Sequence, residues 1–304
     1  MRRLSRRQKA AAALGEWLTR LAISALRLLA KLPYGALRRI GEACGDLAWL
    51  LAGSRRRVAL VNLRLCFPDW SEDRRRAVAR GHFRCLMRSL FDRFVFWYEP
   101  AERTRELVTV RGLAHFLAHQ GRPVIMLGPH FVGIDAGGMR FQLDYPAGFM
   151  YAKQKSAALS AAMTRGRMRY GRARTFLRNE GLRGPIRAIR EGTPLYLLPD
   201  MDLGARDAVF VPFFGVPAAT VTSVARLAKI TGALVIPLVT RMTDRGYEVQ
   251  LYPAWEDYPG EDLVVAARRM NEFIEQRVLE MPEQYLWSHK RFKTRPPGSP
   301  NPYR

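Results

Sequence analysis

PVIMLGPHFVGIDAGG, residues 123–138, joins two kinds of local pattern. Its first five residues form a short apolar run of the kind that makes a buried strand. Gly128 and Pro129 then end the strand, because glycine turns freely and proline has no N–H for a strand ladder. A helical pattern follows at 134–143. The stretch therefore predicts a buried strand that passes through a tight turn into a helix.

The same alternation continues along the chain from about residue 105. Further short apolar runs, most of them bounded by Gly or Pro, lie at 107–110, 147–152, 193–199, 233–240 and 247–253. Further helical patterns lie at 113–120, 157–170, 183–191, 220–231 and 261–280. Strands that alternate with helices predict an α/β fold with a mainly parallel central sheet, covered by helices on both faces.

The part of the chain before this alternation reads as almost entirely helical. Ser71 begins its last long helix, and Glu72 and Asp73 occupy the first turn, where acidic residues favour the positive end of the helix dipole. We therefore predict a helical N-terminal region over residues 1–104 and an α/β domain over residues 105–304.

The first 32 residues have an amphipathic pattern. Polar residues fall on one helical face, at Glu16, Arg20, Ser24, Arg27 and Lys31, and apolar residues fall opposite, at Leu18, Leu21, Ala25, Leu28, Leu29 and Leu32. No run of about 18 uncharged apolar residues exists, so a strong spanning helix is not indicated. The pattern, with a basic tip at Arg2, Arg3, Arg6, Arg7 and Lys9, favours a membrane-associating helix in the headgroup region. An ordinary helix packed on the domain and a tilted span with snorkelling arginines remain the alternatives.

The charge balance indicates an anionic partner. Fifty Lys and Arg residues against 27 Asp and Glu give a formal net charge of +23. Nucleic acid, acidic lipid, a phosphorylated substrate and an acidic protein all fit this surplus. The three cysteines are widely spaced and form no CxxC pair, which argues against a disulfide framework and against a thiolate metal site.

His130 and Asp135 form the first candidate site. The histidine lies where the 123–127 strand should end, and ligands of open α/β sheets gather at the carboxyl ends of strands. Asp135 in the first helical turn could reach back, hold the proton on one imidazole nitrogen and leave the other nitrogen as a general base. Gly133 would keep the turn slim enough for substrate. The alternative is that His130 only caps the helix and Asp135 binds a backbone donor.

Two further stretches carry candidate residues. Asp200 and Asp202 in LLPDMDLG (197–204) also follow a strand, so they should converge on the same edge of the sheet as His130. A metal-holding pair of the kind found in nucleotide-sugar glycosyltransferases and a simple Asx turn are the alternatives. VFVPFFGVPAAT (209–220) is either core or the wall of an acyl slot.

Arginines are concentrated between residues 165 and 190. They lie at Arg165, Arg167, Arg169, Arg172, Arg174, Arg178, Arg183, Arg187 and Arg190. Arginine binds phosphate in a bidentate manner, so we expect a phosphorylated or highly anionic ligand. Nucleic acid is disfavoured because aromatic residues are few here and no known binding motif is present. His115 and His119 have the spacing of a helical metal pair, but no third ligand is apparent, and no metal is expected.

Taken together, several ordered strings resemble the lipid A late acyltransferase family, the lauroyl and myristoyl transferases of Gram-negative bacteria, which are relatives of the glycerolipid acyltransferases. The strings are RRRVALVNLRLCFPDWSEDRR (55–75), HFVGID (130–135), GRMR (166–169), LPDMDLG (198–204), VFVPFFGVPAAT (209–220) and HKRFKTRPPG (289–298). The chain departs from the family in its arginine-interrupted N-terminal helix, because family members usually carry a more hydrophobic anchor there.

The resemblance implies an O-acyltransferase at the cytoplasmic face of the inner membrane, without a cofactor. His130 would be the base and Asp135 its orienting carboxylate. Arg167 and Arg169 match the family's Arg-x-Arg and would hold phosphate or phosphopantetheine, and Asp200 matches its Pro-Asp and would also contact substrate. Backbone N–H groups near Gly133, or an arginine, would stabilise the oxyanion. The family's donor is acyl carrier protein, an acidic protein, and its acceptor is a bis-phosphorylated glucosamine disaccharide lipid. Acylation of a lysophospholipid or another glycolipid, and a non-enzymatic module that binds nucleic acid, are the alternatives.

Overall fold

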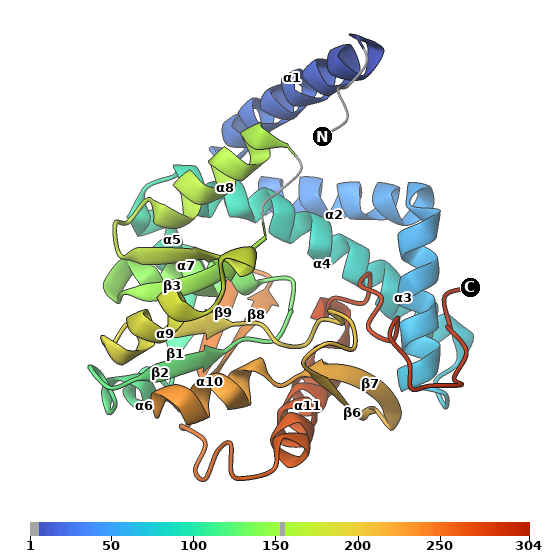
Figure 1. The fold of residues 1–304 in the computed structure, drawn as a ribbon. Helices are drawn as coiled ribbons and strands as arrows, with labels where there is room; N and C mark the ends of the chain where they lie inside the picture. Colours follow the sequence, from blue (N-terminus) through green and yellow to red (C-terminus); the bar gives the residue numbers. More distant parts are fainter. Residues whose placement is uncertain (1–5, 153–155) are drawn as a thin grey trace.

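The computed structural model describes residues 6–152 and 156–304, and helices occupy its first hundred residues (Figure 1). They are α1 (Arg6–Leu29), α2 (Tyr34–Leu51), α3 (Gly53–Cys66), α4 (Glu72–Tyr98) and α5 (Ala101–Leu107). The helical N-terminal region predicted over 1–104 is present, although its separation from the rest as a domain stays a prediction. Arg2 and Arg3 of the basic tip lie outside the described residues.

A seven-stranded, mostly parallel sheet follows and confirms the predicted α/β fold. Its strands are β1 (Val108–Arg111), β2 (Val124–Leu127), β3 (Ala147–Tyr151), β4 (Ala173–Leu177), β5 (Leu195–Leu197), β8 (Leu234–Thr243) and β9 (Gly246–Leu251). The order across the sheet is β1-β9-β8-β2-β5-β3-β4, and only the β8–β9 hairpin pairs antiparallel. The helices between the strands are α6 (Ala114–Leu117), α7 (Ile134–Asp144), α8 (Ala157–Met168), α9 (Arg183–Arg190) and α10 (Ser223–Thr231), and α11 (Leu263–Glu280) follows β9.

Helices cover both faces of this sheet, which is why its central strand is apolar at every position. The side chains of β2 alternate between two hydrophobic clusters, and all four are at most 1% exposed. Ile125 and Leu127 belong to the cluster that includes α9, α10 and α11, whereas Val124 and Met126 belong to the one that includes α6 and α7. A strand buried on both faces reads as a continuous apolar run, as PVIML does.

Long helix α4 joins the N-terminal region to the sheet. Its N-cap is Ser71, whose Oγ accepts a hydrogen bond from Arg74 N, as the sequence predicts. Its first half packs in one hydrophobic cluster through Phe83, and its second half packs in the other through Phe94. The helix therefore reaches across the fold, and residues of its C-terminal half can reach the sheet's carboxyl edge.

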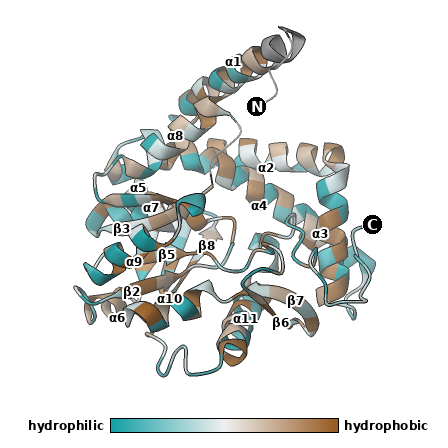
Figure 2. Cartoon of the chain, viewed as in Figure 1, coloured by the Kyte–Doolittle hydropathy of each residue, from teal (hydrophilic) through white to brown (hydrophobic). Residues whose placement is uncertain are grey.

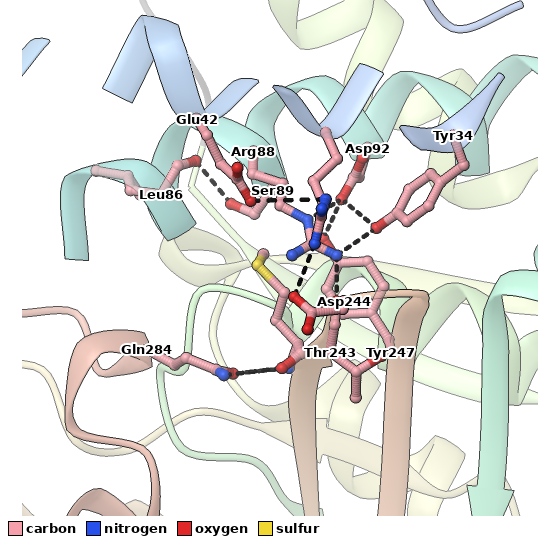
Figure 3. Close-up of polar contacts among 12 residues, drawn as sticks. Tyr34, Glu42, Leu86, Arg88, Ser89, Asp92, Thr243, Asp244, Tyr247 and Gln284 are labelled. Carbon is pink, nitrogen blue, oxygen red and sulfur yellow. Dashed lines mark hydrogen bonds and ion pairs between the residues drawn. The ribbon is translucent and has the colours of Figure 1, made fainter. Parts of the chain in front are cut away.

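A buried polar cluster ties the middle of α4 to α2 and to the β8–β9 hairpin (Figure 3). Asp92 Oδ2 accepts hydrogen bonds from the hydroxyls of Tyr34, at 3.1 Å, and Tyr247, at 2.6 Å. Arg88 donates to the Tyr34 hydroxyl at 2.8 Å and also to the carbonyl of Thr243. Such contacts are needed because an unpaired polar group in this interior would be costly.

Three strands were not predicted from the sequence. Edge strand β4 falls inside the arginine-dense stretch, and its side chains are only partly buried, so it lacks an apolar run. Strands β6 (Ala208–Phe213) and β7 (Val216–Val221) form a separate antiparallel hairpin from the 209–220 stretch. Phe213 of this hairpin is fully buried in the core, whereas Phe210 is 38% exposed.

Helix α1 projects from the body of the molecule (Figure 1), and its ribbon is coloured in part hydrophobic and in part hydrophilic (Figure 2). The large apolar residues of α1 and α2 that are more than half exposed are Leu14, Trp17, Leu18, Leu21, Leu28, Leu47, Leu50 and Leu51. Within residues 6–152 and 156–304, the helices fall short of the length and apolarity that crossing a membrane requires.

Candidate active site

His130 lies just beyond the carboxyl end of β2, and its backbone is held from two sides. Its carbonyl accepts a hydrogen bond from Leu286 N at 3.1 Å, and the next residue, Phe131, forms an isolated bridge with Tyr285. Gly128 is required at the strand exit, because a Cβ there would lie 2.3 Å from the ring of Tyr196. The imidazole is 18% exposed, so a substrate group can reach it.

Asp200 is the carboxylate that holds this imidazole. It follows β5, the strand that pairs in parallel with β2, so the carboxyl ends of the two strands bring the residues together. Asp200 Oδ1 lies 2.6 Å from His130 Nδ1, and Oδ2 accepts a hydrogen bond from His130 N at 2.9 Å. The predicted convergence of His130 and Asp200 on one edge of the sheet is confirmed.

The ionisation of Asp200 follows from these contacts. Burial would raise the pKa of this carboxyl, but the charge of His130 and the hydrogen bonds from its ring and backbone hold the pKa below the ordinary value. An ionised Asp200 keeps the proton on Nδ1 and leaves Nε2 of His130 as an acceptor.

Asp135 has different partners from the one predicted. It lies in the first turn of α7, as expected, but its oxygens face two arginines. Oδ2 lies 2.6 Å from Arg93 Nε, and Oδ1 accepts a hydrogen bond from Arg167 Nη2 at 3.1 Å. The prediction that Asp135 holds the imidazole is therefore wrong in its geometry, because the neighbouring strand supplies Asp200 instead. Burial opposes ionisation of Asp135, yet the two guanidinium charges keep its pKa below the ordinary value.

The structure separates the two arginines of the GRMR string. Arg167, near the end of α8, reaches Asp135. Arg169 instead donates to the carbonyl of Phe96 at 3.0 Å and lies over the ring of Tyr170, with 4.8 Å from Cζ to the ring centroid. Arg169 thus holds the C-terminal end of α4 against the end of α8.

Gly133 and its neighbours have a packing role that the sequence did not predict. Gly133 precedes α7, and a Cβ at this position would lie 3.0 Å from the ring of Tyr247. A Cβ at Gly137 would lie 2.1 Å from Thr240 Oγ1. The glycines therefore allow α7 to pack closely on β8 and β9, which is a different reason from the slim substrate path that the sequence suggested.

Asp202 and His289 join the loop after β5 to the C-terminal segment. Asp202 accepts hydrogen bonds from Thr294 N at 2.6 Å and Thr294 Oγ1 at 2.7 Å, and its own N–H donates to His289 Nε2 at 3.0 Å. Burial, and then the nearby charge of His130, lower the pKa of His289 to about 4. Asp202 is thus a structural residue that keeps the Asp200 loop in place.

Sequence reasoning missed Arg93 and His289. Arg93 is a charged residue within the apolar string FDRFVFWY, and that isolation was the available signal. His289 lies in a cationic string and could not be linked to Asp202 without the fold. His115 and His119 line a surface pocket with Trp255 and Tyr258, away from His130.

Comparison with known proteins identifies the family to which the chain belongs. The model of the bacterial lipid A biosynthesis acyltransferase family matches residues 4–294. The chain belongs to this family. It is an acyltransferase of lipid A biosynthesis, as the resemblance implied.

Relatives with assigned names agree with this family. The lipid A biosynthesis lauroyltransferase of Escherichia coli (strain K12) is 34% identical, with 94% of this chain and 95% of that protein covered. The lipid A biosynthesis palmitoleoyltransferase of the same organism is also 34% identical, with 94% of each chain covered. Among solved structures, the 1-acyl-sn-glycerophosphate acyltransferase of Thermotoga maritima is 12% identical with a TM-score of 0.42, covering 81% of this chain and 98% of that one.

Proposed function

We propose that this acyltransferase moves a fatty acyl group from an acyl carrier protein thioester to a hydroxyl of a lipid A precursor, with His130 as general base. The contact between His130 Nδ1 and Asp200 at the carboxyl ends of β2 and β5 is the observation that supports it best. It leaves Nε2 of a partly exposed imidazole as a proton acceptor, which is what activation of a hydroxyl requires.

The reaction then proceeds in two stages. Nε2 of His130 takes the proton of the acceptor hydroxyl while the oxygen attacks the thioester carbonyl, which forms a tetrahedral oxyanion. Collapse breaks the carbon–sulfur bond, and the imidazolium returns its proton to the departing thiolate of the carrier. Asp200 orients the ring and stabilises the transient positive charge. The backbone N–H of Gly133 or an arginine of the site would stabilise the oxyanion.

The membrane is the second part of this proposal. The acceptor is a lipid, and exposed Leu18 and Leu21 on projecting α1 suit an interfacial helix at the cytoplasmic face of the inner membrane. The net charge of +23 favours both anionic headgroups and an acidic carrier protein.

Transfer assays on purified variants test the catalytic proposal. His130→Ala should remove almost all transfer, and Asp200→Asn should lower kcat by about 10²–10⁴-fold with little change in KM, because the ring loses its fixed tautomer. Asp144→Asn, at the far end of α7 and paired with Arg105 and Arg140, is the matched control and should keep the wild-type rate. A kcat for Asp200→Asn within twofold of the wild type would reject the base mechanism.

Mass spectrometry of lipid A tests the substrate. A strain that lacks this gene and any redundant homologue should accumulate lipid A with one acyl chain fewer. An unchanged acyl count in that strain would exclude a lipid A acceptor, and His130→Ala should fail to restore the missing chain.

A further inference from the structure

Tyr285 lies beside the residue that carries the imidazole, and backbone contacts hold it there. It forms an isolated bridge with Phe131, and the residue after it, Leu286, donates from its N–H to the carbonyl of His130 at 3.1 Å. The residue before it accepts a hydrogen bond from Val132 N at 2.8 Å. The backbone on both sides of Tyr285 is therefore paired with the chain that leaves β2.

The side chain of Tyr285 is directed at Asp200. The residue is only 3% exposed, and its ring packs on the rings of Phe131, with 5.7 Å between centroids, and Trp287, with 5.0 Å. Its hydroxyl is hydrogen-bonded to Asp200. Burial, and then the negative charge of Asp200, raise the pKa of this phenol well above its ordinary value. The hydroxyl therefore keeps its proton and is the donor in this contact.

Asp200 has acceptor sites left for this hydroxyl. Its Oδ1 lies 2.6 Å from His130 Nδ1, and its Oδ2 accepts a hydrogen bond from His130 N at 2.9 Å. An ionised carboxylate offers about four acceptor sites, and these two contacts do not fill them. Asp200 is 1% exposed, so a further donor has to come from the protein. Tyr285 supplies that donor from a different chain segment, which fixes the orientation of the carboxylate.

The segment around Tyr285 is itself anchored to α3. Asn62, which is fully buried, donates from Nδ2 to the carbonyls of Trp287 and His289, each at 2.7 Å. The indole N–H of Trp287 donates to the carbonyl of Pro282 at 2.6 Å, so the segment is also closed on itself. These contacts involve neither residue of the candidate base, and they hold Tyr285 in place independently of it.

We propose that Tyr285 is a positioning residue for the candidate base: its hydroxyl holds the Asp200 carboxylate in the orientation that accepts the Nδ1 proton of His130. The catalytic part of this inference rests on the proposed function. Because Tyr285 acts through Asp200, removal of the hydroxyl should loosen the contact between carboxylate and ring without changing how substrates bind.

Proton exchange, which needs no turnover, tests the contact. In protein with isotope-labelled histidine, NMR follows the Nδ1 proton of His130, and His130→Ala identifies its signal. Tyr285→Phe keeps the ring and removes only the hydroxyl, so we expect this proton to exchange with water about 5- to 10-fold faster. Tyr34→Phe removes a hydroxyl that donates to another buried carboxylate, Asp92, and as the matched control should leave the exchange unchanged.

Kinetics test whether the hydroxyl acts through Asp200. Tyr285→Phe should lower kcat about 10-fold and leave KM within about twofold, because the base loses its alignment while the substrate contacts remain. In the Asp200→Asn background the same substitution should change kcat little, since the group that it positions is already altered. A purely structural role of Tyr285 would lower kcat by the same factor in both backgrounds.

The exchange and kinetic results can each overturn the inference. Slower exchange in Tyr285→Phe would mean that the hydroxyl only draws charge from the carboxylate, and unchanged exchange would mean that it has no effect on the contact. Either result, or equal losses of kcat in the two backgrounds, would reject the positioning role. Faster exchange in Tyr285→Phe, together with a wild-type protein that transfers no acyl group, would reject the proposed function alone.

Discussion

Asp92 and Asp200 are both buried carboxylates, yet their pKa values move in opposite directions. The charge and hydrogen bonds of His130 lower the pKa of Asp200 against the effect of burial. For Asp92, burial dominates and raises the pKa to about 6, despite hydrogen bonds from Tyr247 and Tyr34 and the charge of Arg88. Asp92 Oδ1 is buried without a partner among the described residues, which adds to the cost of ionisation.

The raised pKa of Asp92 predicts a pH-dependent stability. Between pH 4 and pH 7 the unfolded chain loses this proton before the folded chain does, so the free energy of unfolding should fall by about 2 kcal/mol as pH rises. Asp92→Asn removes this contribution, because the amide does not titrate. Urea unfolding of both proteins across this range measures it. Parallel pH curves for wild type and variant would contradict the prediction.

The residues of the candidate site were predictable singly but not as pairs. His130 and Asp200 each follow an apolar strand, so their place at the carboxyl edge followed from local pattern alone. Their contact depends on β2 and β5 being neighbours, and strand order is set by packing across the whole sheet. Asp135 was assigned to His130 because it is close in sequence, whereas its real partners, Arg93 and Arg167, lie 42 and 32 residues away.

At the scale of elements, most strands of the sheet were predicted as apolar runs, including partly exposed edge strand β1, whereas β4 and the β6–β7 hairpin were missed. The central strands are buried on both faces and read as apolar runs. Edge strand β4 carries Arg174, paired with Glu191 at the surface, and so resembles a loop in sequence. The β6–β7 hairpin contains two prolines, at Pro212 and Pro217, which weigh against strand when only local pattern is available.

Helices α1 and α8 are joined by one acidic side chain. The carboxylate of Glu16 accepts hydrogen bonds from Ala157 N at 2.9 Å and Ala158 N at 3.0 Å, and these bonds lower its pKa. It thereby satisfies two free donors at the positive end of α8. Because α8 carries Arg167, this contact links the projecting helix to the ion pair of Arg167 with Asp135.

Removal of the charge on Glu16 should loosen the start of α8. We expect Glu16→Gln to speed amide hydrogen exchange at Ala157 and Ala158 several-fold, since a neutral amide is a weaker acceptor and no longer complements the helix dipole. Hydrogen-exchange mass spectrometry with peptides over α8 measures this. Glu106→Gln, an exposed residue of α5, is the control. Equal protection of α8 in both variants would mean that Glu16 does not hold this helix.

At the scale of the whole molecule, charge and exposed apolar surface would have separate roles in the proposed membrane binding. The net charge of +23 attracts an anionic surface over a distance that salt limits to about 8 Å at 0.15 M ionic strength. Burial of apolar side chains in the headgroup region acts only on contact and is little affected by salt. Leu18, at 51% exposure, and Leu21, at 55%, could supply the second contribution on α1.

Vesicle binding can separate the two contributions. Wild-type binding to vesicles with anionic lipid should fall as salt rises but level off above zero, because the leucine contacts remain. The double variant Leu18→Glu/Leu21→Glu should bind at least 10-fold more weakly at high salt, since burial of each leucine contributes roughly 1.5–3 kcal/mol. Val265→Glu/Leu279→Glu on α11 replaces residues of similar exposure and adds the same charge, so it controls for electrostatics. If both double variants lose binding equally, charge alone attaches the protein; if only the α1 variant does, its apolar face is the contact with the bilayer.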